Sequence, residues 1–212
     1  MEARREEPCL PVEALVVGPI QNNVYLIGGD GGLLVVDPGS EPERILQAIG
    51  DRQVDAIVLT HCHWDHVGAA KALRDATGAP VAAGAVDAPV ICGDTILCSS
   101  HQPFDPCPVD VALHDGDTLE AAGGRWQVVE TPGHTPGGIC LFLDGGEGNG
   151  RPILVSGDTL FRGTHGRTDF AGGDPVAMQE SLRRLAQLPP ETLVLPGHNE
   201  PSTIAAELCW IG

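Results

Sequence analysis

The sequence has few basic residues, and this shortage narrows the range of its partners. Twelve Lys and Arg residues stand against 29 Asp and Glu residues, which gives a formal net charge of −17. A surface of this charge repels polyanions, so we expect no nucleic-acid partner and no membrane partner. We interpret the acidic excess as a feature that favours solubility.

Long apolar runs and paired cysteines are also absent. No stretch approaches the 18 consecutive apolar residues of a membrane-spanning helix. The charged N-terminal stretch MEARREEPCLP is not followed by the apolar region of a secretory signal, so we predict a cytoplasmic protein. The seven cysteines include no Cys-x-x-Cys pair, and we expect free thiols.

The residues that are present predict one α/β domain over residues 1–212. Hydrophobic residues make up 42% of the chain, and the 28 glycines and 18 prolines are scattered between apolar runs, as in a globular protein. Short apolar and β-branched runs bounded by turn residues predict strands. These runs lie at residues 12–17, 23–28, 32–37, 56–60, 80–84, 117–120, 125–131, 138–144, 152–158 and 192–198.

Three segments favour helices that follow strands. The first is residues 38–50, in which Ser40 is the expected N-cap and Pro42 lies in the first turn. The others are residues 66–77 and residues 174–188, the last capped by its first residue, an aspartate. We therefore expect two mixed β-sheets flanked by helices. Residues 93–108 show no clear period and predict a long loop, either a lid or a surface excursion.

Three histidines and an aspartate crowd into the stretch LTHCHWDHVG, directly after a predicted buried strand. On an extended segment, residues two apart point the same way, so His61 and His63 can face one ion. The chain then turns into a helix, which can aim Asp65 and His66 at a neighbouring point. Imidazole and carboxylate groups together suit zinc, iron or manganese better than calcium.

Three further strand ends carry residues of the same kinds. In each, an apolar strand runs into a glycine and then into a potential ligand, namely His134, Asp158 or His198. Glycine permits the tight turn and close backbone approach that a buried site needs. Loops at one rim of the fold would bring these residues together. Seven candidate ligands exceed the four of a closed structural zinc site, and they fit two ions that share a carboxylate.

The motifs that hold these residues resemble those of a known family. THCHWDHVG, ETPGHTPGG, SGDTLFRG and LPGHNEPS resemble, in that order, the ligand motifs of the metallo-β-lactamase-fold hydrolases, especially the small single-domain glyoxalase II-like branch. VVDPGS resembles the first motif of that superfamily, in which Asp37 would support the metal-binding loops. The resemblance spans about residues 12–203 and implies an αβ/βα four-layer sandwich with its site at the rim between the sheets.

The resemblance also implies how the ligands are shared between two ions. The first ion would be held by His61, His63 and His134, the second by Asp65, His66 and His198, and Asp158 would bridge them. Two divalent ions are implied, with zinc as the expected metal and iron or manganese as alternatives. In the B1 β-lactamases the position of Asp158 is a cysteine, which argues against that class.

The implied reaction is hydrolysis of a thioester or ester, as in hydroxyacylglutathione hydrolases. The ions would lower the pKa of a bridging water, and the resulting hydroxide would attack a carbonyl carbon. Asp65 would orient the hydroxide and relay its proton while Asp158 bridges the ions, which makes these two the predicted catalytic residues. A thiolate leaving group needs little protonation, so a thioester suits a site with no evident general acid.

The stretch FRGTHGRTDFAGGD supports an alternative reaction. Similar segments occur in small single-domain glyoxalase II-like proteins and also in persulfide dioxygenases, which have the same fold but use one iron, held by the equivalents of His61, His134 and Asp158. In that family an arginine near the substrate matches Arg167. The alternative to hydrolysis is therefore oxidation of glutathione persulfide by a mononuclear iron enzyme.

Substrate contacts are harder to assign from this stretch. Arg162 and Arg167 are the candidates, and an ion pair with a neighbouring loop is the other interpretation of Arg167. His165 departs from the family pattern, and it either faces solvent at the pocket mouth or joins the site.

The resemblance leaves the substrate partly open. Full-length glyoxalase II enzymes carry a C-terminal helical domain that supplies much of the glutathione pocket, whereas fourteen residues follow His198 here. We expect a small-molecule thioester or ester, with or without a glutathione part, and a monomer or small homo-oligomer. A catalytically silent scaffold would lack a ligand, and none of the seven is missing.

Overall fold

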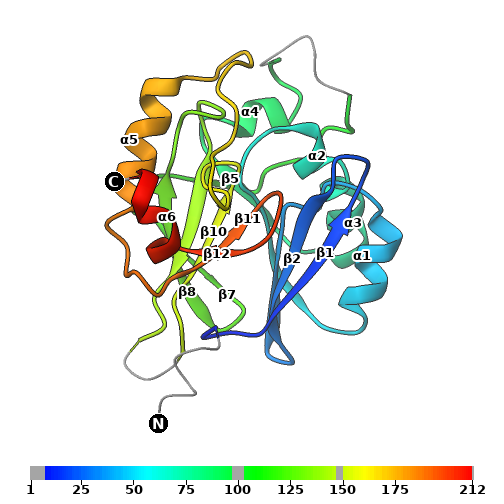
Figure 1. The fold of residues 1–212 in the computed structure, drawn as a ribbon. Helices are drawn as coiled ribbons and strands as arrows, with labels where there is room; N and C mark the ends of the chain where they lie inside the picture. The colour runs from blue at the N-terminus through cyan, green and yellow to red at the C-terminus, as the bar shows by residue number, and fades with distance from the viewer. Residues whose placement is uncertain (1–7, 97–102, 147–149, 212) are drawn as a thin grey trace.

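The computed structural model describes residues 8–96, 103–146 and 150–211, which form two mixed β-sheets (Figure 1). Among these residues the first sheet has six strands in the order β1-β2-β3-β4-β5-β6. The first three strands pair antiparallel, and β3 to β6 run parallel. The strands are β1 (Val12–Val17), β2 (Asn22–Gly29), β3 (Gly32–Val36), β4 (Val54–Leu59), β5 (Val81–Gly84) and β6 (Val111–Leu113).

The second sheet is built from the second half of the chain. Its described strands follow the order β12-β11-β10-β9-β8-β7, and only the pair β10–β11 is parallel. The strands are β7 (Thr118–Ala121), β8 (Gly124–Glu130), β9 (Ile139–Leu143), β10 (Ile153–Gly157), β11 (Leu193–Pro196) and β12 (Ser202–Thr203). Each sheet therefore comes from one continuous half of the chain.

Helices flank the two sheets (Figure 1). They are α1 (Pro42–Ile49), α2 (Trp64–Val67), α3 (Ala70–Thr77), α4 (Ala88–Ile91), α5 (Pro175–Leu185) and α6 (Ile204–Ile211). Buried Leu73 of α3 belongs to an apolar cluster on the first sheet, and Leu182 of α5 belongs to one on the second. A third cluster, with Val58 and Trp126, joins the two sheets face to face. The predicted sandwich of two mixed sheets flanked by helices is confirmed.

The helix expected over residues 66–77 is instead two helices, and this prediction is wrong in detail. α2 ends at Val67 and α3 begins at Ala70. Between them the backbone of Gly68 lies against that of Gly39, where a Cβ atom on Gly68 would stand 2.4 Å from the Gly39 carbonyl oxygen. Ala69 N donates to the carbonyl of Pro38 at 2.9 Å rather than to its own helix. Tertiary contact with the loop after β3 therefore interrupts the helix.

Ser40 does not cap α1. The N-cap residue is Glu41, which has left-handed backbone angles and makes no side-chain cap hydrogen bond. Its Oε1 instead accepts from Gly18 N at 2.8 Å, which ties the helix to the turn after β1. The expected cap of α5 is confirmed, because Asp174 accepts from Val176 N and Ala177 N.

Four short elements were not anticipated from the sequence: α4, β6, β12 and α6. The first three are four residues long or shorter, too short to show a helical or strand period. In α6, apolar residues lie all around the helix rather than along one stripe, so the helical period is not visible in the sequence. Residues 97–102 of the expected 93–108 loop lie outside the described residues. The cysteines at positions 9, 62, 92, 107, 140 and 209 are free thiols.

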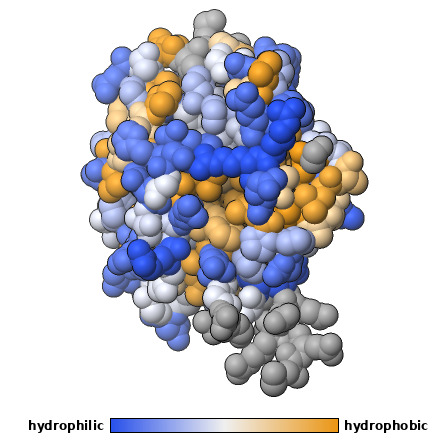
Figure 2. Space-filling model, turned by 90° about the vertical axis from the view of Figure 1, so that its left-hand side faces the viewer, coloured by the Kyte–Doolittle hydropathy of each residue, from blue (hydrophilic) through white to orange (hydrophobic). Residues whose placement is uncertain are grey.

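The outer face formed by α5 and α6 is of mixed polarity. Figure 2 shows this side of the molecule, with hydrophobic side chains gathered beneath a band of hydrophilic ones. Val176 of α5 and Leu208 of α6 are among the exposed apolar residues. Within the described part of the chain, none of the helices has the length and apolar character needed to cross a bilayer.

Candidate metal centre

The seven candidate ligands follow the ends of four strands, one in the first sheet and three in the second. His61, His63, Asp65 and His66 follow β4 of the first sheet. In the second sheet, candidate ligands follow β8, β10 and β11, namely His134, Asp158 and His198. The strand ends meet at one rim, so the site lies across the seam between the two halves of the fold.

A change from extended chain to helix divides the ligands after β4 into two pairs. His63 has extended backbone angles and stands at the N-cap of α2. Asp65 and His66 lie within this single helical turn, and both are buried. The extended residues and the helical residues therefore point to neighbouring but different places, as the spacing predicts.

The first group brings together three histidines from the two sheets. Ligand atoms of His61, His63 and His134 all lie within 4.8 Å of one another. The ring centroids of His63 and His134 are 4.4 Å apart, and their planes are nearly perpendicular. Three imidazole nitrogens around one point form the protein side of a tetrahedral zinc site with one open position.

The second group consists of Asp65, His66 and His198, whose ligand atoms also lie within 4.8 Å of one another. Asp158 stands between the two groups. Its Oδ2 lies 3.4 Å from His134 Nε2, and its Oδ1 lies 3.3 Å from His66 Nε2. One carboxylate therefore reaches a ligand atom of each group, which is the position of a bridging ligand.

Buried polar atoms without partners show that the groups suit a cation. Among the described residues, the Nε2 atoms of His61, His66 and His134 and the Oδ1 atom of Asp158 have no hydrogen-bond partner. Leaving such atoms buried without a hydrogen bond costs free energy. A divalent ion in each group would give these atoms the ligand bonds they lack, so the residues present fit two metal ions.

The opposite nitrogens of the same imidazoles are fixed by hydrogen bonds. His66 Nδ1 donates to Asp37 Oδ2 at 2.9 Å, and His134 Nδ1 donates to the carbonyl oxygen of Arg167 at 2.7 Å. His61 Nδ1 lies 3.1 Å from Thr60 Oγ1. Such contacts set the tautomer that leaves Nε2 available to a metal ion.

Asp37 supports this arrangement rather than adding a third metal group. It is near enough to His61 and His66 to form a third potential cluster. However, Thr60 N and Thr60 Oγ1 both donate to its carboxylate at 2.7 Å, and His66 Nδ1 also donates to it. Its oxygens are therefore engaged in holding the ligand loop after β4.

Charges in the site favour a cation. Burial lowers the pKa of His61 well below its usual range, so its imidazole is neutral. Burial acts in the same direction on His66, but the carboxylates of Asp158, Asp37 and Asp65 outweigh it and raise the pKa of His66 well above its usual range. For Asp158, burial would raise the pKa, and His66 reverses this and lowers it. A proton on His66 therefore takes the place of a metal ion, and the two compete.

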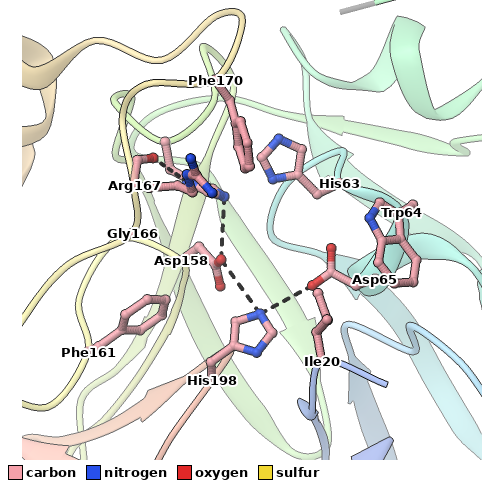
Figure 3. Close-up of a pocket in the computed structure, with 11 residues that line it drawn as sticks. Ile20, His63, Trp64, Asp65, Asp158, Phe161, Gly166, Arg167, Phe170 and His198 are labelled. Carbon is pink, nitrogen blue, oxygen red and sulfur yellow. Dashed lines mark hydrogen bonds and ion pairs between the residues drawn. The ribbon is translucent and has the colours of Figure 1, made fainter. Parts of the chain in front are cut away.

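A pocket of about 420 Å³ opens over the ligands (Figure 3). In Figure 3, Asp65, Asp158 and His198 point toward one another at its floor. The lining residues are Ile20, His63, Trp64, Asp65, His134, Asp158, Phe161, Gly166, Arg167, Phe170 and His198. A polar floor beneath apolar walls suits a small organic substrate.

The two candidate substrate arginines have different positions. Arg167 lines the pocket, and its guanidinium lies 3.9 Å from the ring centroid of Phe170. It also makes two hydrogen bonds to Asp169, at 2.7 and 2.6 Å. Arg162 is not among the described lining residues, and it forms an exposed ion pair with Glu200.

His165 stands outside the pocket wall. It is not among the described lining residues, and its ring stacks on Trp210 of α6 with centroids 6.2 Å apart. Its Nδ1 lies 2.7 Å from the carbonyl oxygen of Gly166, which does line the pocket. His165 therefore contacts the segment that forms the wall rather than the space inside.

Four lining residues were not singled out from the sequence: Ile20, Phe161, Gly166 and Phe170. The two phenylalanines lie in the distinctive stretch FRGTHGRTDFAGGD, and aromatic residues in that stretch could have indicated a pocket wall. Ile20 belongs to the turn between β1 and β2 and is about half exposed. An apolar residue in a Gly-Pro turn was the one local hint of its role.

Comparison with known proteins places these features in a family. The family model described as "Metallo-beta-lactamase superfamily" matches residues 17–198, a range that holds all seven ligands. The chain is 32% identical over 206 residues to the hydroxyacylglutathione hydrolase GloC of Haemophilus influenzae. This match covers 92% of the chain and 94% of GloC.

Two solved structures are similar in fold and sequence. The di-iron-bound form of TTHA1623 has a TM-score of 0.78 and 38% identity, covering 92% of this chain and 96% of that one. ETHE1 from Myxococcus xanthus has a TM-score of 0.73 and 30% identity, covering 92% of this chain and 80% of that one. One similar protein thus holds two iron ions, the number that the two ligand groups here would take.

Proposed function

The chain belongs to the metallo-beta-lactamase superfamily, and from that membership we propose that it is a dinuclear metal-dependent hydrolase acting on thioesters of the hydroxyacylglutathione type. Members of this superfamily are generally hydrolases, and the site has the His and Asp residues to bind metal. The likeness to GloC supports the substrate class in the proposal. Zinc is the proposed metal, because imidazole and carboxylate ligands suit it.

One observation supports the dinuclear site above all: two complete ligand groups share one carboxylate. Asp158 approaches His134 of the first group and His66 of the second at 3.4 and 3.3 Å. A single-ion enzyme would need only the first group and Asp158. Here the second group is complete as well, and buried His66 makes it costly to leave without a cation.

The protein residues prepare the reaction in two ways. When bound, two divalent ions would supply a water molecule that ionises near neutral pH and a Lewis acid for the carbonyl oxygen. Asp65 lines the pocket and its Oδ2 lies 3.2 Å from His198 Nε2, where it would orient the water and accept its proton. Asp158 would hold the two groups at a fixed separation.

The pocket walls suit a substrate with an apolar acyl part and a thiolate leaving group. Trp64, Phe161 and Phe170 would exclude water from the bound carbonyl. None of the described lining residues is a tyrosine or lysine able to protonate a leaving group. A thiolate leaves without that help. Arg167 would bind a substrate carboxylate in exchange for Asp169.

The decisive experiment combines elemental analysis with a substrate panel. Purified protein should hold two ions per chain and cleave S-lactoylglutathione or another thioester. Asp158→Asn should lower kcat/KM by about a hundredfold or more, because the bridging ligand is weakened. Asp51→Asn, at an exposed position, is the matched control and should retain activity. One ion per chain and no thioester cleavage would contradict the proposal.

A mononuclear iron persulfide dioxygenase is the second candidate. The position of Arg167 in the pocket wall favours it, because Arg167 matches an arginine near the substrate in that family. Its single ion would use His61, His134 and Asp158. One iron per chain together with oxygen uptake on glutathione persulfide would support this candidate and exclude the first.

A further inference from the structure

Asp87 is a buried carboxylate that the proposed reaction does not use. It follows β5 and is 1% exposed. It occupies the N-cap position of the short helix α4, but its side chain makes no cap hydrogen bond there. Aspartate is a favoured cap, so its sequence position points to a local role that it does not have. Its carboxylate is directed to other parts of the chain.

Both oxygens of Asp87 accept hydrogen bonds from the two loops that carry the first ligand group. Oδ2 accepts from Cys62 N at 3.0 Å and from Thr135 Oγ1 at 2.7 Å. Oδ1 accepts from Gly137 N at 2.7 Å. Cys62 lies between His61 and His63 in the chain, and Thr135 directly follows His134. One carboxylate therefore joins the segments on which all three histidines of the group lie.

The packing around this contact leaves it little freedom. A Cβ atom on Gly137 would lie 2.3 Å from Asp87 N and 2.5 Å from its Oδ1. A Cβ atom on Gly84, the last residue of β5, would lie 2.2 Å from the carbonyl oxygen of Gly137. The loop after His134 is thus in direct backbone contact with the end of β5, and Asp87 fixes it there.

A carboxylate is suited to this place for a physical reason. All three of its partners are donors, and two of them are peptide N–H groups that cannot reverse their role. An asparagine has one acceptor oxygen and would direct its NH₂ group at one of these donors.

We propose that Asp87 is a positioning residue of the first metal site. Its carboxylate sets the distance between the segment of His61 and His63 on the first sheet and the loop of His134 on the second. The three ligand nitrogens then converge on one ion. This inference rests on the proposed function only in requiring a metal ion on these histidines.

The test measures metal affinity at each site in the full chain. Wild type, Asp87→Asn and Asp87→Ala are titrated with Zn²⁺ against a competing chelator, and ions are counted by elemental analysis. Nitrogen-15 NMR of the histidine rings shows whether His134 or His198 carries the ion. Both variants should lose affinity at the first site on the order of tenfold, whereas the second site keeps its affinity.

Two controls separate positioning from general stability. Asp110→Asn removes a carboxylate that also binds β5, at Val81 N, but contacts neither ligand loop, and it should leave both affinities unchanged. Thr135→Val removes one donor to Asp87, whereas Thr135→Ser keeps it. The valine variant should weaken the first site and the serine variant should restore it, even if the Asp87 variants fail to fold.

Equal losses at both sites, or unchanged affinity in Asp87→Asn and Thr135→Val, would overturn the positioning role. A loss in Asp110→Asn as large as that in Asp87→Asn would overturn it as well. A wild-type protein that binds no ion at His134 would overturn the proposed function itself. The two failures are therefore distinguishable.

Discussion

Gly197 shows how tightly the ligand residues are packed. A Cβ atom on this residue would lie 2.4 Å from Asp158 Oδ1 and 2.6 Å from His66 Cε1. The backbone of Gly197 is not in the left-handed region, so its requirement for glycine is steric rather than conformational. The residue directly precedes His198 and brings its strand end against two ligands at once.

We therefore expect Gly197→Ala to damage the second metal group. The added methyl group displaces His66 or Asp158, so affinity for the second ion should fall by about 10- to 100-fold. The free energy of unfolding should fall by about 1–3 kcal/mol. Gly29→Ala is the control, because nothing lies within 4 Å of its Cβ position. Metal titration and urea denaturation check both variants, and equal behaviour would refute the steric explanation.

The buried thiol of Cys140 gives a prediction on pH. Burial raises its pKa from 9.0 to about 11. Between these values the unfolded chain loses the proton while the folded chain keeps it, so stability falls as pH rises. Two pKa units correspond to about 2–3 kcal/mol. Urea denaturation between pH 8 and 11 should show this loss in the wild type and a correspondingly smaller one in Cys140→Ala. Parallel curves would contradict it.

At the scale of elements, the start of α5 is joined to the His134 loop. Asp174 Oδ1 accepts from Val176 N at 2.8 Å and from Ala177 N at 3.1 Å. Asp174 N donates to the carbonyl oxygen of Gly133 at 2.8 Å. The cap thus stabilises the helix at the point where it meets a ligand-bearing loop.

Removal of this cap should cost stability. Asp174→Ala leaves the first N–H groups of α5 without their acceptor, and the free energy of unfolding should fall by about 1 kcal/mol. Asp174→Ser, which keeps an acceptor oxygen, should recover most of the loss. Urea denaturation with an unchanged m-value measures the effect. An alanine variant as stable as the wild type would show that the cap contributes nothing.

Elements with strong local patterns could be predicted from the sequence. The β-branched runs fixed the main strands, and Asp174 with Pro175 marked the start of α5. The break at Gly68 could not be predicted, because it depends on Gly39 approaching from another loop. The same holds for Ser40, whose place as cap is taken by Glu41 through a contact with distant Gly18.

In the candidate site, too, local patterns were predictable and contacts between distant segments were not. Spacing after β4 placed His61 and His66 in different directions, and the structure brings them into two neighbouring groups. Asp87 was not anticipated, because its partners lie 25 to 50 residues away and leave no local pattern. Ile20 enters the pocket in the same way, from a turn remote in sequence from the ligands.

At the scale of the whole molecule, the metal groups join the two sheets. His61 and His63 come from the first sheet and His134 from the second, and the second group is divided in the same way. Metal ions that bind this arrangement bind only the folded state, so they stabilise it by mass action.

Metal removal should therefore lower the stability of the entire chain. With ions at about a thousand times their dissociation constant, each contributes about 4 kcal/mol, which a chelator would abolish. Thermal unfolding followed with and without chelator measures this difference. A His134→Ala variant should respond less to the chelator. An identical melting temperature in both conditions would show that the ions do not link the sheets.

The order of the ligands along the chain has a consequence for biosynthesis. The residues after β4 emerge from the ribosome early, His134 follows, and His198 comes last. A growing chain that has passed residue 134 holds every member of the first group, but the second remains incomplete for 64 more residues. The second group therefore cannot form before His198 has been synthesised and β11 has joined its sheet.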